Sequence, residues 1–197
     1  FAQNNYITIA PDFLGYGESD NPSDLAIEER FQTYGTTITL LKSIPNLNGQ
    51  LSTVNSQVLS DPERVGLWAH SNGGQIAISV LEITGADFPT VLWAPVSKPF
   101  PYSILYYTDE FDDRGKALRK LIADFEVDYD VEAYSPTNFL DRIQAPIQED
   151  RLQLMDLAGC SGEVAALVPF SEGGIVRFGN VGLGNFQGQV EFGLEHR

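Results

Sequence analysis

The chain alternates between short apolar runs and longer segments in which apolar residues recur with helical spacing. The short runs are typical of strands, and the expected strands occupy residues 6–10, 65–69 and 90–96. In the longer segments apolar residues lie three and four positions apart, which is the spacing of one helix face. The expected helices occupy residues 30–43, 73–84 and 112–126. Strands that alternate with helices favour an α/β fold with a mainly parallel sheet flanked by helices.

The two later helices are expected to differ in burial. Residues 73–84 are apolar on most sides, so this helix is expected to lie inside the protein. In residues 112–126 the apolar side chains form a single stripe, made by Leu118, Leu121, Ile122 and Phe125. This second helix is therefore expected on the surface.

The composition changes after about Gln148 and divides one domain into two parts. Residues 1–148 carry the alternating pattern and form its core, which begins almost directly in a strand and is interpreted as incomplete at the N-terminus. Residues 149–197 form a divergent segment, and nine of the 18 glycines fall after residue 158. Its last residues, 190–197, favour a short helix that Gly193 would weaken.

Charge and composition exclude several classes of partner. The chain has 27 acidic and 12 basic side chains among 197 residues, a formal net charge of -15. Such a chain repels phosphate backbones and anionic membrane surfaces, so neither nucleic acid nor a membrane is an expected partner. No apolar run approaches the roughly 20 residues that span a bilayer, and the opening residues FAQNNYITIA have no basic leader. The single cysteine, Cys160, cannot form an internal disulfide.

The segment VGLWAHSNGG, residues 65–74, carries the chemistry. It predicts a strand, a sharp turn and a helix, with Ser71 at the turn and the small residues Ala69 and Gly73 two positions to either side. This matches the G-x-S-x-G nucleophile elbow, with Ala in place of the first Gly. Such a turn presents the serine hydroxyl above the sheet, and the backbone N–H of Asn72, at a helix N-terminus, can stabilise an oxyanion.

At this point the chain resembles the α/β-hydrolase family, and within it the prolyl oligopeptidase-like serine hydrolases. The resemblance is carried by four stretches in the family's order across about residues 6–148: ITIAPDFLGYGESDNPSD, DPERVGLWAHSNGG, TVLWAPVSKPF and SPTNFLDRIQAPI. It implies a partial α/β-hydrolase fold. It also implies an enzyme that cleaves a peptide or ester bond through an acyl-enzyme on Ser71. Serine peptidase and carboxylesterase both remain open, because one site on this fold serves both reactions. The resemblance implies no cofactor and no metal.

The resemblance also implies an acid after the nucleophile in chain order. The family's H-x-G-x-x-D loop is missing here, and residues 149–151 are expected to interrupt the strand that should precede it. Asp156 is the candidate acid, and Asp150 is the alternative.

The catalytic base would be a histidine further along the chain. His196 is the only histidine downstream of Ser71, although the family's G-x-x-H turn is missing and the residues around His196 resemble a closing helix. Asn185 and Gly174 are the alternative occupants of the neighbourhood of the base. A reading-frame slip, a divergent homologue or a chain that has lost its base would each give this pattern.

Each of these residues also has a structural interpretation. Ser71 could serve only as a helix N-cap, and His70 is expected to be structural because neighbouring side chains at such a turn point apart. Three tyrosines after the third strand could line a substrate pocket or pack in the core: Tyr102, Tyr106 and Tyr107. The acidic stretch 109–132 could hold Ca²⁺ but lacks the spacing of a calcium loop, so a solvated surface is expected.

The rival function is a non-catalytic or inactivated α/β-hydrolase-like protein that serves as a scaffold or binding module. The missing motifs favour it. The family's second oxyanion donor precedes the first residue given, and a sheet without its early strands is expected to expose an edge and apolar surface.

Overall fold

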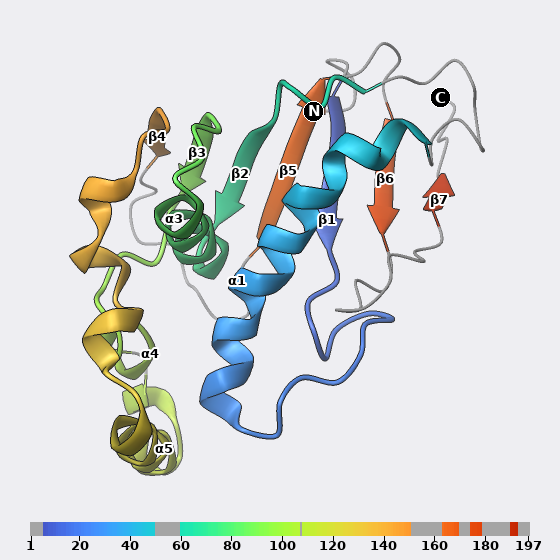
Figure 1. Cartoon of the computed structure of the whole chain (residues 1–197). Coiled ribbons are helices and arrows are strands. Elements are labelled where there is room, and N and C mark those ends of the chain that lie inside the picture. Colours follow the sequence, from blue (N-terminus) through green and yellow to red (C-terminus); the bar gives the residue numbers. More distant parts are fainter. Residues whose placement is uncertain are drawn as a thin grey trace.

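A computed structural model describes residues 6–49, 60–106, 108–150, 163–169, 174–178 and 190–192. Seven strands form one sheet in the order β4-β3-β2-β5-β1-β6-β7 (Figure 1). The strands are β1 (Tyr6–Pro11), β2 (Gly66–His70), β3 (Thr90–Trp93), β4 (Ile147–Asp150), β5 (Glu163–Pro169), β6 (Gly174–Phe178) and β7 (Val190–Phe192). The expected strands at 6–10, 65–69 and 90–96 thus correspond to β1, β2 and β3.

The helices lie between the strands, as the alternating pattern predicts. The α-helices are α1 (Ala26–Ser43), α3 (Asn72–Thr84), α4 (Tyr102–Leu105) and α5 (Lys116–Asp128). Short 3-10 helices are η2 (Ile44–Asn46), η3 (Thr108–Glu110), η4 (Val131–Tyr134), η5 (Pro136–Asn138) and η6 (Leu140–Arg142). None of the helices in the described part of the chain is long and apolar enough to cross a membrane.

Strands β2, β3 and β4 form a parallel unit with aligned ends. Leu67 pairs with Thr90, and His70 pairs with Trp93, which in turn pairs with Asp150. The carboxyl ends of all three strands therefore lie at one edge of the sheet, the edge at which parallel α/β sheets place their ligands.

The sheet is mixed, however, and not mainly parallel. Strand β5 lies between β1 and β2 and is antiparallel to both, with Glu163 opposite His70. The reason is geometric: β4 ends at the carboxyl edge, and the chain re-enters the sheet as β5 at this same edge, so β5 must run in the opposite direction. Of the six pairings described, three are parallel and three antiparallel.

Two further expectations about the C-terminal part are wrong. Glu149 and Asp150 do not interrupt a strand but continue β4 beside β3. Residues 190–192, expected in a short helix, form β7 antiparallel to β6.

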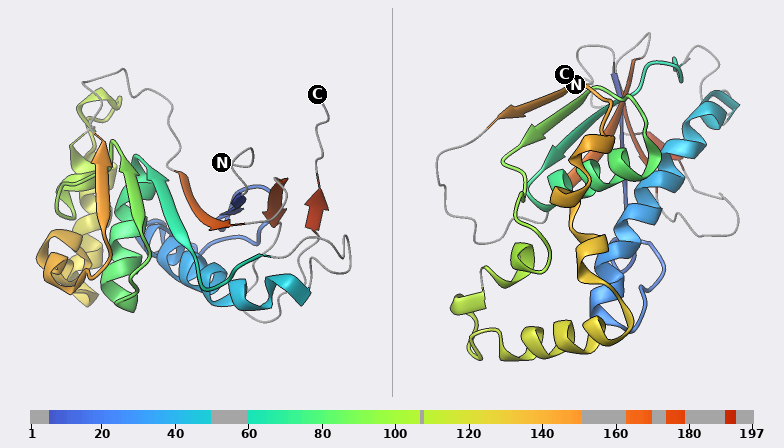
Figure 2. Two further views of the ribbon diagram at one scale, coloured as in Figure 1. Left: turned by 90° about the horizontal axis from the view of Figure 1, so that it is seen from above. Right: turned by 60° about the vertical axis from the view of Figure 1, so that its left-hand side comes forward.

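The main core lies between the sheet and the helices α1 and α3, which pack on the same face (Figure 2). Strand β2 shows the alternation: Leu67 and Ala69 are buried under the helices, whereas Trp68 and His70 on the opposite face are only half-buried. The expected burial of the helix at 73–84 is confirmed, since nine residues of α3 are buried.

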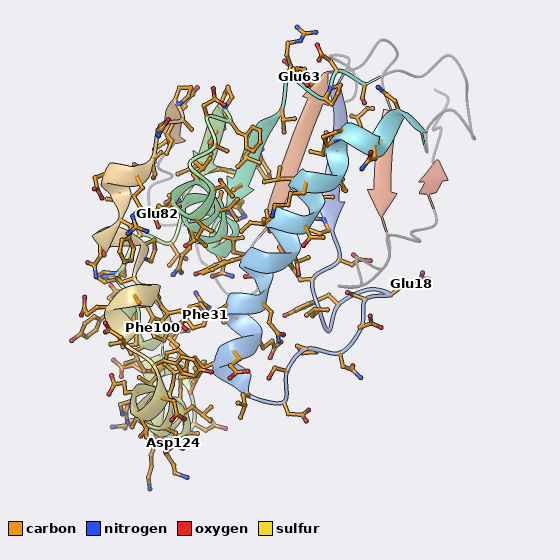
Figure 3. The ribbon with its side chains drawn as sticks, in the orientation of Figure 1. Glu18, Phe31, Glu63, Glu82, Phe100 and Asp124 are labelled. Carbon is orange, nitrogen blue, oxygen red and sulfur yellow. The ribbon has the colours of Figure 1, made fainter. Side chains whose placement is uncertain are left out.

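A second apolar cluster lies at the N-terminal half of α1. It joins α1 to α5 through Ile27, Phe100, Ile122 and Phe125, with Phe31 packed against them. Only Ile122 and Phe125 of α5 are buried, so α5 is the surface helix that its single apolar stripe predicts. We call α5 and the segment that contains Phe100 the outer layer. Figure 3 shows Phe31 and Phe100 together where α1 meets this outer layer.

Candidate active site

Ser71 occupies a sharp bend between β2 and α3. Its backbone angles, φ 54° and ψ -120°, lie in a region that side-chain-bearing residues rarely adopt. Two backbone hydrogen bonds tie the bend to the end of β3 and the segment that follows: Ser71 N–H donates to the Trp93 carbonyl at 3.1 Å, and Val96 N–H donates to the Ser71 carbonyl at 2.9 Å. Strained residues of this kind cost roughly 1–3 kcal/mol and cluster at active sites.

Small residues make the bend possible. Ala69 is fully buried, and Gly74 in the first turn of α3 lies directly against Pro95. Ala94 precedes Pro95 and also has a positive φ, of 45°. Two strained positions, Ser71 and Ala94, thus sit beside each other at the carboxyl edge of β2 and β3.

The Ser71 side chain is available for chemistry. The residue is half-buried and stands at the N-cap position of α3, yet its hydroxyl makes no capping hydrogen bond. The N-cap interpretation is therefore not realised. The backbone fixes Ser71, while its Oγ is left without a structural role toward the described residues.

Asn72 begins α3, and its backbone N–H is one of those that a helix leaves without an internal partner. The side-chain oxygen of Asn72, Oδ1, accepts a hydrogen bond of 2.7 Å from Arg30 Nη2. The same nitrogen donates to Gln75 Oε1 at 2.9 Å. Arg30 was not a candidate from the sequence, because 42 residues separate it from Asn72 and no local pattern links them.

His70 packs against aromatic rings on the sheet face opposite the helices. Its ring centroid lies 4.9 Å from that of Trp93 and 6.5 Å from that of Trp68. This packing agrees with the structural interpretation of His70.

The proposed triad partners are placed only in part. Asp156, His196, Asn185 and Cys160 lie outside the described residues. The alternative acid, Asp150, ends β4 at the same edge of the sheet as Ser71.

Gly174 does not occupy the neighbourhood of a base. It begins β6 opposite Ile7, near the start of β1. Because β1 and β2 both run antiparallel to β5, they point the same way, and Gly174 lies at the opposite edge of the sheet from Ser71.

A cavity lined by described residues also lies away from Ser71. It has a volume of about 450 Å³ and opens at the starts of β2, β3 and β4, lined by residues that include Tyr6, Gly66, Pro89 and Ile147. Near the other end, Tyr102 and Tyr106 are 65% and 61% exposed, so they do not pack in the core. Tyr107 lies outside the described residues.

Within the described residues no group of three or more His, Cys, Asp or Glu side chains could hold a metal ion. Comparison of the chain with family models, curated protein sequences and solved structures found no match. The geometry around Ser71 and the four stretches of sequence resemblance are therefore what bears on function.

Proposed function

We propose that this chain is a serine hydrolase that cleaves a peptide or ester bond through an acyl-enzyme on Ser71, in the manner of the prolyl oligopeptidase-like hydrolases that its sequence resembles. The observation that carries the proposal is the bend itself. A half-buried non-glycine residue with φ 54° and ψ -120° lies between β2 and the buried helix α3, and its hydroxyl makes no capping hydrogen bond. Strain that the fold maintains without a structural use indicates a function.

The reaction follows from the position of Ser71 at the start of a helix. Oγ attacks the carbonyl carbon of the substrate while its proton passes to a base, and the carbonyl electron pair moves onto oxygen. The Asn72 N–H, at the positive end of α3, donates to this oxyanion. The C–N or C–O bond then breaks, the leaving group takes the proton from the base, and water hydrolyses the acyl-enzyme by the same steps.

The base and the acid of this proposal are His196 and Asp156, with Asp150 as the alternative acid. Asp150 lies two strands from Ser71 along the same edge, since β3 separates β4 from β2. General acid–base transfer contributes about 10²–10⁴-fold to such reactions. Substitution of each of the three residues by Ala or Asn therefore ranks them by the fold loss in reaction rate.

A fluorophosphonate probe tests the proposal, because it phosphonylates an activated serine. Wild-type protein is expected to be labelled at Ser71, as located by mass spectrometry of the peptides, and Ser71→Ala protein is expected to remain unlabelled. Ser97→Ala is the matched control, since Ser97 is exposed in the loop after β3 and its loss should leave labelling unchanged. Folded wild-type protein that is not labelled would contradict the proposal and favour the non-catalytic scaffold or binding module.

A further inference from the structure

Arg30 links α1 to the first turn of α3 at the residue that follows the proposed nucleophile. One terminal nitrogen, Nη2, donates to Asn72 Oδ1 at 2.7 Å and to Gln75 Oε1 at 2.9 Å. Gln75 is only 1% exposed, so this guanidinium reaches into the interior beneath the bend. A single cation thus holds two side chains of the turn that presents the Asn72 N–H.

This contact is not expected to stabilise the folded protein by itself. A helix N-terminus carries partial positive charge, so a nearby cation is unfavourable for the helix, and the first turn of α3 has no acidic residue to offset it. Burial, the largest influence, lowers the pKa of Arg30. Its Nε is buried and has no hydrogen-bond partner among the described residues. Arg30 forms no ion pair with the described residues, whereas Arg64 pairs with Asp61.

We infer that Arg30 is a positioning residue of the hydrolase: it fixes Asn72 so that the backbone N–H points at the oxyanion, and it adds positive charge behind that N–H. The inference rests on the proposed function, since it names how the same site is held. An arrangement that costs stability in the resting protein becomes favourable when negative charge develops on the substrate oxygen. Arg30 acts through Asn72 and needs no contact with the substrate.

The planar guanidinium suits this role better than an ammonium group would. Its N–H groups diverge in one plane with fixed geometry, whereas Lys carries a point charge on a flexible chain. Arg30→Lys therefore retains the charge but loses the defined orientation, and Arg30→Met loses both while it keeps an unbranched stem.

The test measures how fast a fluorophosphonate labels Ser71, with the maximal rate constant and the half-saturating concentration determined separately. Arg30→Met is expected to lower the rate constant by roughly 10- to 100-fold, because a displaced oxyanion donor costs up to about 100-fold and its complete loss about 10²–10³-fold. The half-saturating concentration should stay within about two-fold. Arg30→Lys should recover part of this loss. Arg64→Met is the matched control, because Arg64 is an exposed arginine at the far end of β2, and it should label as the wild type does.

A double-mutant cycle separates positioning from a general structural effect. Asn72→Ala keeps the backbone N–H but removes one of the two acceptors of Arg30. Arg30→Met should therefore lower the rate by a clearly smaller factor in the Asn72→Ala protein than in the wild type, because only the effect of its charge remains. Thermal unfolding of each variant shows whether the protein is folded, and Arg30→Gln serves as a second neutral variant should Arg30→Met not fold.

The outcomes distinguish this inference from the proposed function. Wild-type protein that is not labelled at Ser71 overturns the proposed function and this inference with it. Wild-type protein that is labelled, with unchanged rates in folded Arg30→Met and Arg30→Gln proteins, overturns this inference alone. Effects of Arg30→Met and Asn72→Ala that multiply independently would also overturn it, because Arg30 would then not act through Asn72.

Discussion

Gly74 lies so close to Pro95 that a Cβ atom at position 74 would be 2.8 Å from the Pro95 Cα. Pro95 belongs to the segment that follows β3, and the next residue, Val96, donates its N–H to the Ser71 carbonyl. The close approach of α3 to this segment therefore holds the bend in place. A side chain at position 74 would meet backbone that has no room to move without disturbing Ser71.

Gly74→Ala is expected to destabilise the protein by roughly 1–3 kcal/mol, as overpacking in a buried region does. Gly35→Ala provides the control: Gly35 is exposed within α1, and a Cβ there meets nothing within 4 Å. That change should instead stabilise the helix by about 0.5–1 kcal/mol. Urea denaturation of both variants measures the two free energies, and equal effects would show that α3 and Pro95 are not in close contact.

Ser71→Gly should stabilise the folded protein while it removes the nucleophile. The positive φ of 54° strains any residue with a side chain, and Gly relieves this strain. Against that gain stands the greater freedom of Gly in the unfolded chain, so the expected net change relative to Ser71→Ala is about 1 kcal/mol in favour of Gly. Ser71→Ala keeps the strained Cβ and is the reference. A lower melting temperature for Ser71→Gly than for Ser71→Ala would contradict the strained bend.

Glu82 gives the fold a dependence on pH. It lies on α3 near η6, only 7% exposed (Figure 3). Burial, its largest influence, together with Asp141, raises its pKa from 4.5 to about 7, while Arg142 opposes the shift. The folded protein thus holds a proton that the unfolded chain releases, so the free energy of unfolding falls as pH rises from about 4.5 to 7.

Glu82→Gln should remove this loss. The variant is expected to match the wild type below the lower end of that range and to exceed it by roughly 3 kcal/mol above pH 8, given about 1.4 kcal/mol per unit of pKa shift. Glu63→Gln is the control, because Glu63 is exposed. Chemical denaturation across the pH range measures the difference, and a gap that does not vary with pH would exclude the ionisation of Glu82 as its cause.

Phe100 anchors the outer layer to α1. It is 1% exposed, and its ring lies 5.2 Å from that of Phe31 and 5.9 Å from that of Phe125, both edge-on. Phe100→Ala is expected to cost about 3–5 kcal/mol, as for other buried aromatic residues. Phe111→Ala, at a residue that is 53% exposed, should change stability by no more than about 0.5 kcal/mol. Similar losses in the two variants would contradict the packing of this cluster.

The parts of the fold that depend on neighbouring residues could be predicted from the sequence. Hydrophobic periodicity located β1, β2, α3 and α5, because each signal lies within its own element. The bend at Ser71 followed from small residues beside it. Strand β3 is shorter than expected, ending at Trp93, because the positive φ of Ala94 redirects the chain.

The parts that depend on distant residues could not be predicted in this way. The antiparallel place of β5 follows from where β4 ends, and no local pattern gives the direction of a strand. The contact of Arg30 with Asn72 joins residues 42 positions apart, and from the sequence Arg30 is only a polar residue at the start of the expected helix 30–43. The candidate acid Asp156 and the candidate base His196 lie outside the described residues, and nothing tests Asp150 as the alternative acid, so these assignments stay predictions.

Both tryptophans of the chain lie near the bend, Trp68 on β2 and Trp93 at the end of the neighbouring β3. Trp68 and Trp93 have ring centroids 6.1 Å apart, and His70 lies 4.9 Å from Trp93. Indole fluorescence responds to the surroundings of the ring, so the emission of this pair reports on the sheet edge beside Ser71. The protein thus contains an intrinsic optical reporter through which unfolding, or an event at the bend, can be followed in real time without an added dye.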